Sequence, residues 1–270
     1  MLEELHAAIL GLVEGLTEFL PVSSTGHLIL TTRLLGFDGQ VGKEVADTFN
    51  IFIQLGAILA IIAVFPGRFG QLFRFRENRG FSGLRGAGLL AVTSIPGGLL
   101  GLLAGGAIKE RLFNPTTVAI GLAVGAVWIL AVERFLPKVR RESVDDITWT
   151  DAVGIGLFQC LALWPGMSRS SSTILGAMML GVGRRAATEY SFFAAVPLLA
   201  AATLYDLLKS LPHLHTQHVP LFAVGFAVAF VSAWLAVRLF VRFVGRHTLA
   251  PFGWYRLAVA GLAFWYFANK

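Results

Sequence analysis

Charged residues and cysteine are both scarce in this sequence. Only 14% of the 270 residues are charged, whereas 56% are hydrophobic, and the mean hydropathy is +0.71. Soluble globular domains carry about 25% charged residues, so the composition excludes that class and indicates an integral membrane protein. The single cysteine, Cys160, excludes an intrachain disulfide, and we expect its thiol to serve as a small apolar group.

A basic leader is also missing. The first residues, MLEELHAAIL, lack the basic region of a cleaved signal peptide, so we expect this segment to be retained. The net charge of +6 does not require an acidic partner, because excess basic residues in a membrane protein usually lie in cytoplasmic loops. We therefore expect membrane lipid as the surroundings and no nucleic-acid partner.

Long apolar runs, in contrast, are plentiful. A helix needs about 20 residues to cross a hydrocarbon core of about 30 Å. Six stretches reach or approach this length: 48–65, 86–106, 116–135, 187–208, 219–243 and 251–268. Two more, near 2–35 and 149–182, are interrupted by FLPVSSTGH and WPGMSRSSST. Non-helical backbone at membrane depth is tolerated only beside protein or water, so we expect two re-entrant helix pairs around a polar pocket.

The two halves of the chain resemble each other. GLVEGLTEFLPVSSTG from Gly11 parallels GLFQCLALWPGMSRSS from Gly156, with an acidic or amide residue three positions after each glycine. Each half holds one broken pair and three spanning helices, and because three is odd the second half must be inverted. We predict an all-α integral membrane protein with one domain, 1–270, made of repeat 1 (about 1–136) and inverted repeat 2 (about 149–270). Its site would lie near the midplane.

Basic residues are spread unevenly over the predicted loops. Most of them fall in 66–85, 134–141, 184–185 and 238–246, which the predicted spans place on one side. The positive-inside rule makes that side cytoplasmic, so we expect both termini outside. Arg169 is the one basic residue that this topology places away from an interface, whereas Arg256 is expected at a helix end.

Two carboxylates precede the first interruption. Glu14 and Glu18 are four residues apart and share one helical face. An unpaired acidic side chain near the bilayer centre costs on the order of 2.5 to 3.5 kcal/mol, so we expect a compensating cation. A divalent Mg²⁺ or Ca²⁺ held by both carboxylates would suit a phosphate ligand. The alternative is a pair of acids at a solvated helix end.

Hydroxyl residues follow the proline of this segment. Pro21 cannot continue the helix, so Ser23, Ser24 and Thr25 would begin the next one, where free N–H groups and the helix dipole favour an anion such as phosphate. Plain N-capping would need only one of the three. His27, on the face of Ser24, is a candidate general base, proton donor or orienting residue, and a hydrogen-bonded structural histidine is the alternative.

The second interruption has the same order of a proline followed by hydroxyl residues, and it adds a cationic side chain. Ser168 is a candidate cap, and the guanidinium of Arg169 can donate two parallel hydrogen bonds to phosphate oxygens. Among the hydroxyls that follow, Ser170 and Thr173 are further candidates for binding phosphate. The alternative for the arginine is an internal ion pair with one of the two glutamates, and both roles are compatible in the ligand-free protein.

These motifs resemble those of a known family. EGLTEFLPVSSTGH and PGMSRSSST are similar to the signature motifs of bacterial undecaprenyl pyrophosphate phosphatases of the bacitracin-resistance type, and the similarity covers essentially the whole chain. The resemblance implies an inner-membrane enzyme that removes one phosphate from a C55 isoprenyl pyrophosphate. It also implies a required divalent metal and a site open to the periplasm, where both termini would lie.

Carried over by motif, the resemblance implies roles for five residues. Glu14 and Glu18 would form the acidic pair, Ser24 and His27 would be catalytic, and Arg169 would clamp phosphate. The metal and the arginine would stabilise charge on the transferring phosphoryl group, while the serine attacks and the histidine handles its proton. The resemblance leaves the nucleophile open between the serine, the histidine and a water.

Other functions are compatible with parts of this pattern. Broken helices in inverted repeats also occur in secondary transporters, so a flippase or transporter of a phosphorylated lipid is the alternative, although acids, serine, histidine and arginine together exceed what binding needs. An acid-phosphatase-like enzyme would need a histidine several residues after its Ser-Arg, and none follows Arg169 before His213. The metal, the preferred chain length and the oligomeric state, monomer or homodimer, are left open.

Overall fold

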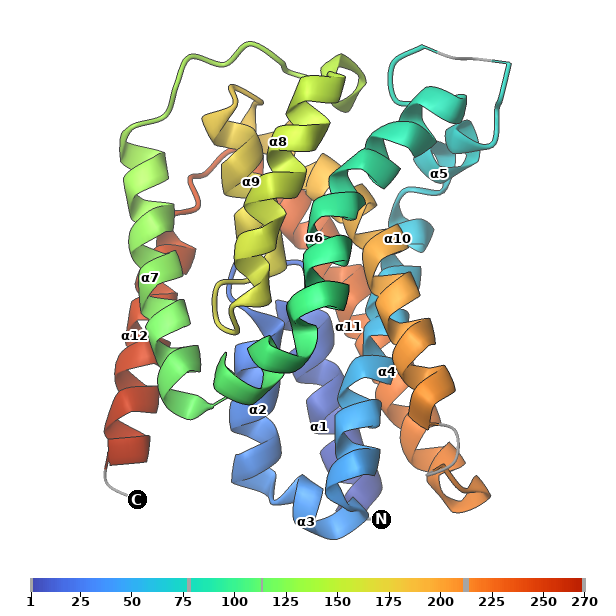
Figure 1. Cartoon of the computed structure of the whole chain (residues 1–270), viewed down its shortest axis with the longest axis vertical. Helices are drawn as coiled ribbons and strands as arrows, with labels where there is room; N and C mark the ends of the chain where they lie inside the picture. Colours follow the sequence, from blue (N-terminus) through green and yellow to red (C-terminus); the bar gives the residue numbers. More distant parts are fainter. Residues whose placement is uncertain (1, 77–78, 113, 211–213, 269–270) are drawn as a thin grey trace.

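The chain folds into a bundle of helices, and the described residues form no strand (Figure 1). The computed structural model describes residues 2–76, 79–112, 114–210 and 214–268. All six predicted apolar stretches are helical: α4 (Lys43–Val64), α6 (Gly83–Leu112), α7 (Pro115–Arg134), α10 (Arg184–Ser210), α11 (Val219–Val244) and α12 (Ala250–Ala268). The prediction of an all-helical fold is confirmed.

Within the described residues, five of these six helices are long and apolar enough to cross a membrane. The helix outside this group is α12. The chain is therefore a multi-pass membrane protein, and the sixth span at 251–268 stays a prediction.

Both predicted interruptions break the helix beside a proline. α1 (Leu2–Thr17) ends before Pro21, and α2 (Ser24–Leu35) begins after it. α8 (Trp149–Gln159) continues as the 3-10 turn η2 (Cys160–Leu163), and α9 (Arg169–Met179) follows Pro165. In Figure 1, α1 and α2 enter from the end that carries both termini, whereas α8 and α9 enter from the opposite end. An inverted repeat would produce this arrangement, and the repeat itself stays a prediction.

Four short elements were not predicted from the sequence. They are α3 (Phe37–Val41), α5 (Pro66–Leu72) and the 3-10 turns η1 (Val144–Asp146) and η4 (Thr216–His218). α5 and the loop after α7 lie at the end of the bundle opposite both termini, whereas α3 lies at the end with the termini (Figure 1). The basic stretches 66–85 and 134–141 thus share one end of the molecule.

Small residues let the first re-entrant helix approach α11 closely. A Cβ on Gly11 would lie 2.4 Å from the carbonyl oxygen of Gly225, and one on Gly15 would lie 2.5 Å from that of Ala229. Such backbone contact is typical of helix pairs in membranes. It anchors α1 along α11, so that the end of α1 reaches the middle of the bundle.

Candidate functional site

Two helix breaks, one between α1 and α2 and one between η2 and α9, share an unusual backbone geometry. Ser23 and Ser168 have φ angles of 73° and 72°, and among the described parts of the chain they are the only non-glycine residues with positive φ. Each caps the next helix, because the Ser23 Oγ accepts from the Gly26 N–H and the Ser168 Oγ accepts from the Ser171 N–H. Non-glycine residues in this region are strained, and such strain clusters at functional sites.

Hydrogen bonds join one break to the other. The Ser170 hydroxyl donates to the Leu20 carbonyl at 2.7 Å, and the Ser171 hydroxyl donates to the Pro21 carbonyl at 3.2 Å. Both serines are fully buried. The N-termini of α2 and α9 are therefore fixed side by side, although they are about half a chain apart in sequence.

Arg256 of α12 donates hydrogen bonds to the backbone at both breaks. Its side chain is fully buried, and no carboxylate among the described residues forms an ion pair with it. Instead its nitrogens donate to the Ser171 hydroxyl and to five backbone carbonyls, those of Pro21, Gly121, Leu122, Gly166 and Met167. The prediction that Arg169 is the one basic residue away from an interface is wrong. Because α12 packs along α7, Arg256 faces the turns instead of an interface.

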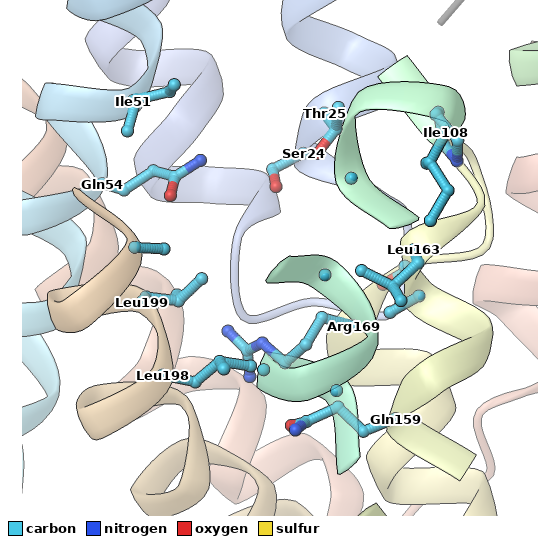
Figure 2. Close-up of a pocket in the computed structure, with 18 of the residues that line it drawn as sticks. Ser24, Thr25, Ile51, Gln54, Ile108, Gln159, Leu163, Arg169, Leu198 and Leu199 are labelled. Carbon is cyan, nitrogen blue, oxygen red and sulfur yellow. The ribbon is translucent and has the colours of Figure 1, made fainter. Parts of the chain in front are cut away.

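A cavity of about 630 Å³ lies where the breaks meet (Figure 2). This volume is in the range of small-molecule sites. The lining residues at its polar end come from both breaks and are Glu18, Ser23, Ser24, Thr25, Ser168 and Arg169. Because two helix N-termini face the same space, their free N–H groups and dipoles favour an anion there.

Glu18 connects the two breaks within this cavity. The Arg169 Nη2 donates to the Glu18 Oε1 at 2.7 Å, and the Ser24 hydroxyl donates to the Glu18 Oε2 in a short hydrogen bond. The guanidinium also lies over the Phe19 ring, 5.5 Å from its centroid, and donates to the Ser191 carbonyl. Its Nε has no partner among the described residues. The internal ion pair considered from the sequence is present, and it lies in the cavity.

The sequence of this chain matches the model of a known protein family. The model is that of the bacitracin resistance protein BacA, and it covers residues 7–262, which include both breaks and Arg256. The chain belongs to the BacA family.

Relatives of this BacA-family chain are described as undecaprenyl-diphosphatases. The protein of Nitratidesulfovibrio vulgaris is 55% identical over 99% of this chain and 100% of its own length. That of Oleidesulfovibrio alaskensis is 56% identical over 98% of this chain and its full length. In Methylococcus capsulatus the identity is 50%, over 94% of this chain and 91% of the relative.

Glu14 of the BacA-family chain is buried completely and does not line the cavity. Neither carboxyl oxygen has a hydrogen-bond partner among the described residues, and the charged groups that act on it are Glu18 and Arg169. A buried carboxylate without a partner is unfavourable, so this position fits a cation. No group of three His, Cys, Asp or Glu residues gathers in the described chain. A metal held by Glu14 and Glu18 would therefore keep waters, as Mg²⁺ does.

His27 points away from the cavity. Its Nδ1 donates to the Ser23 carbonyl at 2.8 Å, so in the neutral ring the Nε2 accepts from the Tyr255 hydroxyl, also at 2.8 Å. The two rings stack with centroids 5.7 Å apart. His27 does not belong to the described lining of the cavity, whereas Ser24 does. Tyr255 lies more than 200 residues away in sequence, so no local pattern could have predicted it.

Two residues predicted to bind phosphate also lie outside the cavity, in the protein core. Ser170 and Thr173 are fully buried and do not line the cavity. Thr173 shares a hydrogen bond of 2.5 Å with the Ser191 hydroxyl and donates to the Arg169 carbonyl. Their hydroxyls thus hold the backbone around Arg169. The structure brings Ser23, Ser24, Thr25, Ser168, Glu18 and Arg169 to the cavity, but not these two.

The lining also contains two glutamines, Gln54 and Gln159, that were not predicted as site residues. Gln159 is 2% exposed, and its Nε2 donates to the Thr93 carbonyl at 3.2 Å. Its Oε1 has no hydrogen-bond partner in the described part of the chain. A signal was available in the sequence, because Gln159 follows Gly156 at the spacing by which Glu14 follows Gly11.

Proposed function

We propose that this protein is an undecaprenyl-diphosphatase, which hydrolyses the phosphoanhydride bond of undecaprenyl diphosphate and leaves the lipid monophosphate. The names of its close relatives support this activity. The observation that carries the proposal is the contact of Arg169 and Ser24 with the same carboxylate, Glu18, beside two helix N-termini. Cation, hydroxyl and base are the groups that phosphoryl transfer requires.

Binding of the diphosphate is assigned to Arg169 and to the N-termini of α2 and α9. The guanidinium matches two phosphate oxygens, and it has a free Nε–H to offer. Backbone N–H groups that are fixed before the reaction stabilise charge on the transferring phosphoryl group without reorganising.

Ser24 is assigned as the nucleophile. Its Oγ bonds to the terminal phosphorus and its proton passes to the Glu18 carboxylate, while the bond from that phosphorus to the bridging oxygen breaks and the lipid monophosphate leaves. A water then bonds to the phosphorus of the phosphoserine, the P–Oγ bond breaks, and one water proton passes to Oγ. Glu18 then releases its proton to solvent. This scheme gives His27 an orienting role, through the Ser23 carbonyl.

A divalent cation, Mg²⁺ or Ca²⁺, is proposed to assist. Glu14 and Glu18 would hold it, and their carboxylate oxygens are the donor type that such ions prefer. When bound, it would supply positive charge that neutralises the diphosphate. The proposal also places the cavity mouth and both termini on the periplasmic side of an inner membrane, since the basic loops lie at the opposite end.

Phosphate release by purified protein in detergent tests this function. We expect the wild type to release phosphate from undecaprenyl diphosphate, and Arg169→Ala to lower kcat about 10²-fold or more, as the loss of a transition-state donor does. The matched control is Arg185→Ala on α10, whose exposed side chain pairs with Glu189. Wild-type rates in Arg169→Ala, or no hydrolysis by the wild type with a divalent cation present, would contradict the proposal.

A further inference from the structure

A second cavity lies along the last turns of α11. Its volume is about 1000 Å³, and it shares no lining residue with the cavity that holds Glu18 and Arg169. We call it the α11 groove. Its lining comes from Leu16 and Leu20 at the end of α1, from Ala236 and 239–243 of α11, from the turn 245–247, and from Arg185 and Phe252. The reaction proposed above uses none of these residues, so the α11 groove requires a separate explanation.

The α11 groove begins where α1 ends. The close contacts of Gly11 and Gly15 follow each other in the same direction along both helices, so α1 and α11 run parallel. α1 ends at Thr17, shortly after Gly15 meets Ala229. α11 continues to Val244, and at 1.5 Å per residue it extends roughly 20 Å beyond α1. This is about the thickness of one leaflet, since a bilayer with its headgroups measures about 40 to 45 Å.

Apolar side chains form the walls of the α11 groove. Leu16 is 41% exposed and Leu239 is 54% exposed, whereas Phe240 is buried. The Phe240 ring meets that of Phe252 edge to face, with centroids 5.3 Å apart. The groove therefore has a packed aromatic floor and leucines that no other part of the described chain covers. Such surfaces suit a hydrocarbon chain.

The far end of the α11 groove is cationic. Because α11 runs parallel to α1, it ends opposite both termini, at the end with the basic loops (Figure 1). Arg242 and Arg246 are exposed there, and neither side chain forms an ion pair or hydrogen bond with the described residues. Arg185 also lines the groove, but it is paired with Glu189 at 3.0 Å. No acidic residue belongs to the described lining, so two guanidinium groups are available to an anion.

General rules explain the charges but not the cavity. Arginines gather at cytoplasmic helix ends and favour the C-terminal pole of the helix dipole. Arg238 fits this pattern alone, because its guanidinium lies 4.5 Å from the centre of the Trp234 ring and does not line the groove. Arg242 and Arg246 differ from it, since they border a hollow with apolar walls. Charge complementarity and apolar walls together point to an amphipathic anion.

We propose that the α11 groove binds an anionic phospholipid of the leaflet next to the basic loops. Its phosphate contacts Arg242 and Arg246, and one acyl chain runs along Phe240 toward Leu20. Basic pockets between membrane helices recognise anionic lipid headgroups in this way. Leu20 lines the groove, and its carbonyl accepts the Ser170 hydroxyl at the junction of the two breaks. A bound lipid therefore packs against the turn that holds the site, whether or not the proposed function is correct.

Native mass spectrometry of the purified full-length protein tests the proposal. We expect phosphatidylglycerol to bind more tightly than phosphatidylcholine with the same acyl chains. The double variant Arg242→Gln/Arg246→Gln should raise the Kd for phosphatidylglycerol roughly tenfold or more. The matched control is Arg134→Gln/Arg238→Gln, which removes two exposed charges from the same end without altering the groove. Its Kd should equal that of the wild type.

Two further probes separate the lipid from its headgroup. Glycerol phosphate, which lacks the acyl chains, should not bind where phosphatidylglycerol saturates the protein. A phosphatidylglycerol with a photoreactive group at the end of one acyl chain should label the peptide that contains Leu16 and Leu20, and the groove variant should reduce this label. Equal Kd values for the two lipids, equal losses in both double variants, comparable binding of glycerol phosphate, or label confined to other helices would overturn the proposal.

Discussion

The two oxygens of Glu18 have different partners, a guanidinium on one side and a hydroxyl on the other. An anionic ligand that draws Arg169 toward itself would end its ion pair with the carboxylate and leave the hydrogen bond from Ser24 in place. The carboxylate could then accept the serine proton more readily, because a competing positive charge has moved away. In the proposed mechanism, ligand binding by Arg169 would therefore also activate Ser24.

The pair formed by His27 and Tyr255 makes the assignment of Ser24 testable. We predict that Ser24→Ala lowers kcat for phosphate release about 10²-fold or more, because the nucleophile is lost. Tyr255→Phe removes one hydrogen bond to the imidazole and should stay within about threefold of the wild type, as expected for a bond worth about 1 kcal/mol or less. Phosphate release by the purified variants measures both effects. A near-normal rate in Ser24→Ala would assign the attack to a water or to His27 instead.

At the scale of elements, the site depends on the re-entrant pairs α1–α2 and α8–α9, which α12 holds together. Arg256 belongs to α12, yet its hydrogen bonds reach α7 and the turns at both breaks. A buried guanidinium without a carboxylate is stable only when its donors are all satisfied, and here backbone oxygens satisfy them. The turns and the cation therefore stabilise each other.

We predict that Arg256→Met lowers the stability of the purified protein by roughly 3 kcal/mol or more, because it leaves several buried carbonyl groups without a donor. Arg256→Lys should be intermediate, since three donors cannot reach six acceptors. Thermal unfolding in detergent measures both. The control is Arg238→Met, which removes an exposed guanidinium lying 4.5 Å from the centre of the Trp234 ring. An unfolding temperature for Arg256→Met equal to that of the control would refute the role.

The helices were predictable because each depends on its own residues. Apolar runs define the long helices, and Pro21 and Pro165 mark the breaks, since a proline cannot continue a helix. The place of Glu18 and Arg169 in a polar cavity was predictable because charge inside an apolar segment is costly, and that of Ser24 because it follows the proline break. The inward turn of Ser170, the bond between His27 and Tyr255 and the burial of Arg256 depend on contacts between remote segments, which no local period encodes.

The whole molecule has two chemically different ends. The basic loops lie opposite both termini (Figure 1), and the two re-entrant pairs enter from opposite ends. By the positive-inside rule, this charge bias would place the basic end of the bundle in the cytoplasm. The side from which a substrate reaches the cavity follows from that orientation.

Single cysteines can measure this orientation in cells. In a Cys160→Ala background, we predict that a membrane-impermeant maleimide labels Gly39→Cys in α3 but not Gly70→Cys in α5. Both glycines are exposed, and a Cβ on either would meet no atom within 4 Å. Labelling after membrane disruption is the control for reactivity. The opposite pattern in intact cells would invert the proposed topology.

The clamp formed by Arg256 has a consequence for biosynthesis. Translation proceeds from the N-terminus, so both hairpins leave the ribosome long before the arginine that ties them together. A nascent chain that stops ahead of α12 lacks six hydrogen bonds at the junction of its turns. We therefore expect the junction of the two turns to become fully stabilised only when the last helix is inserted.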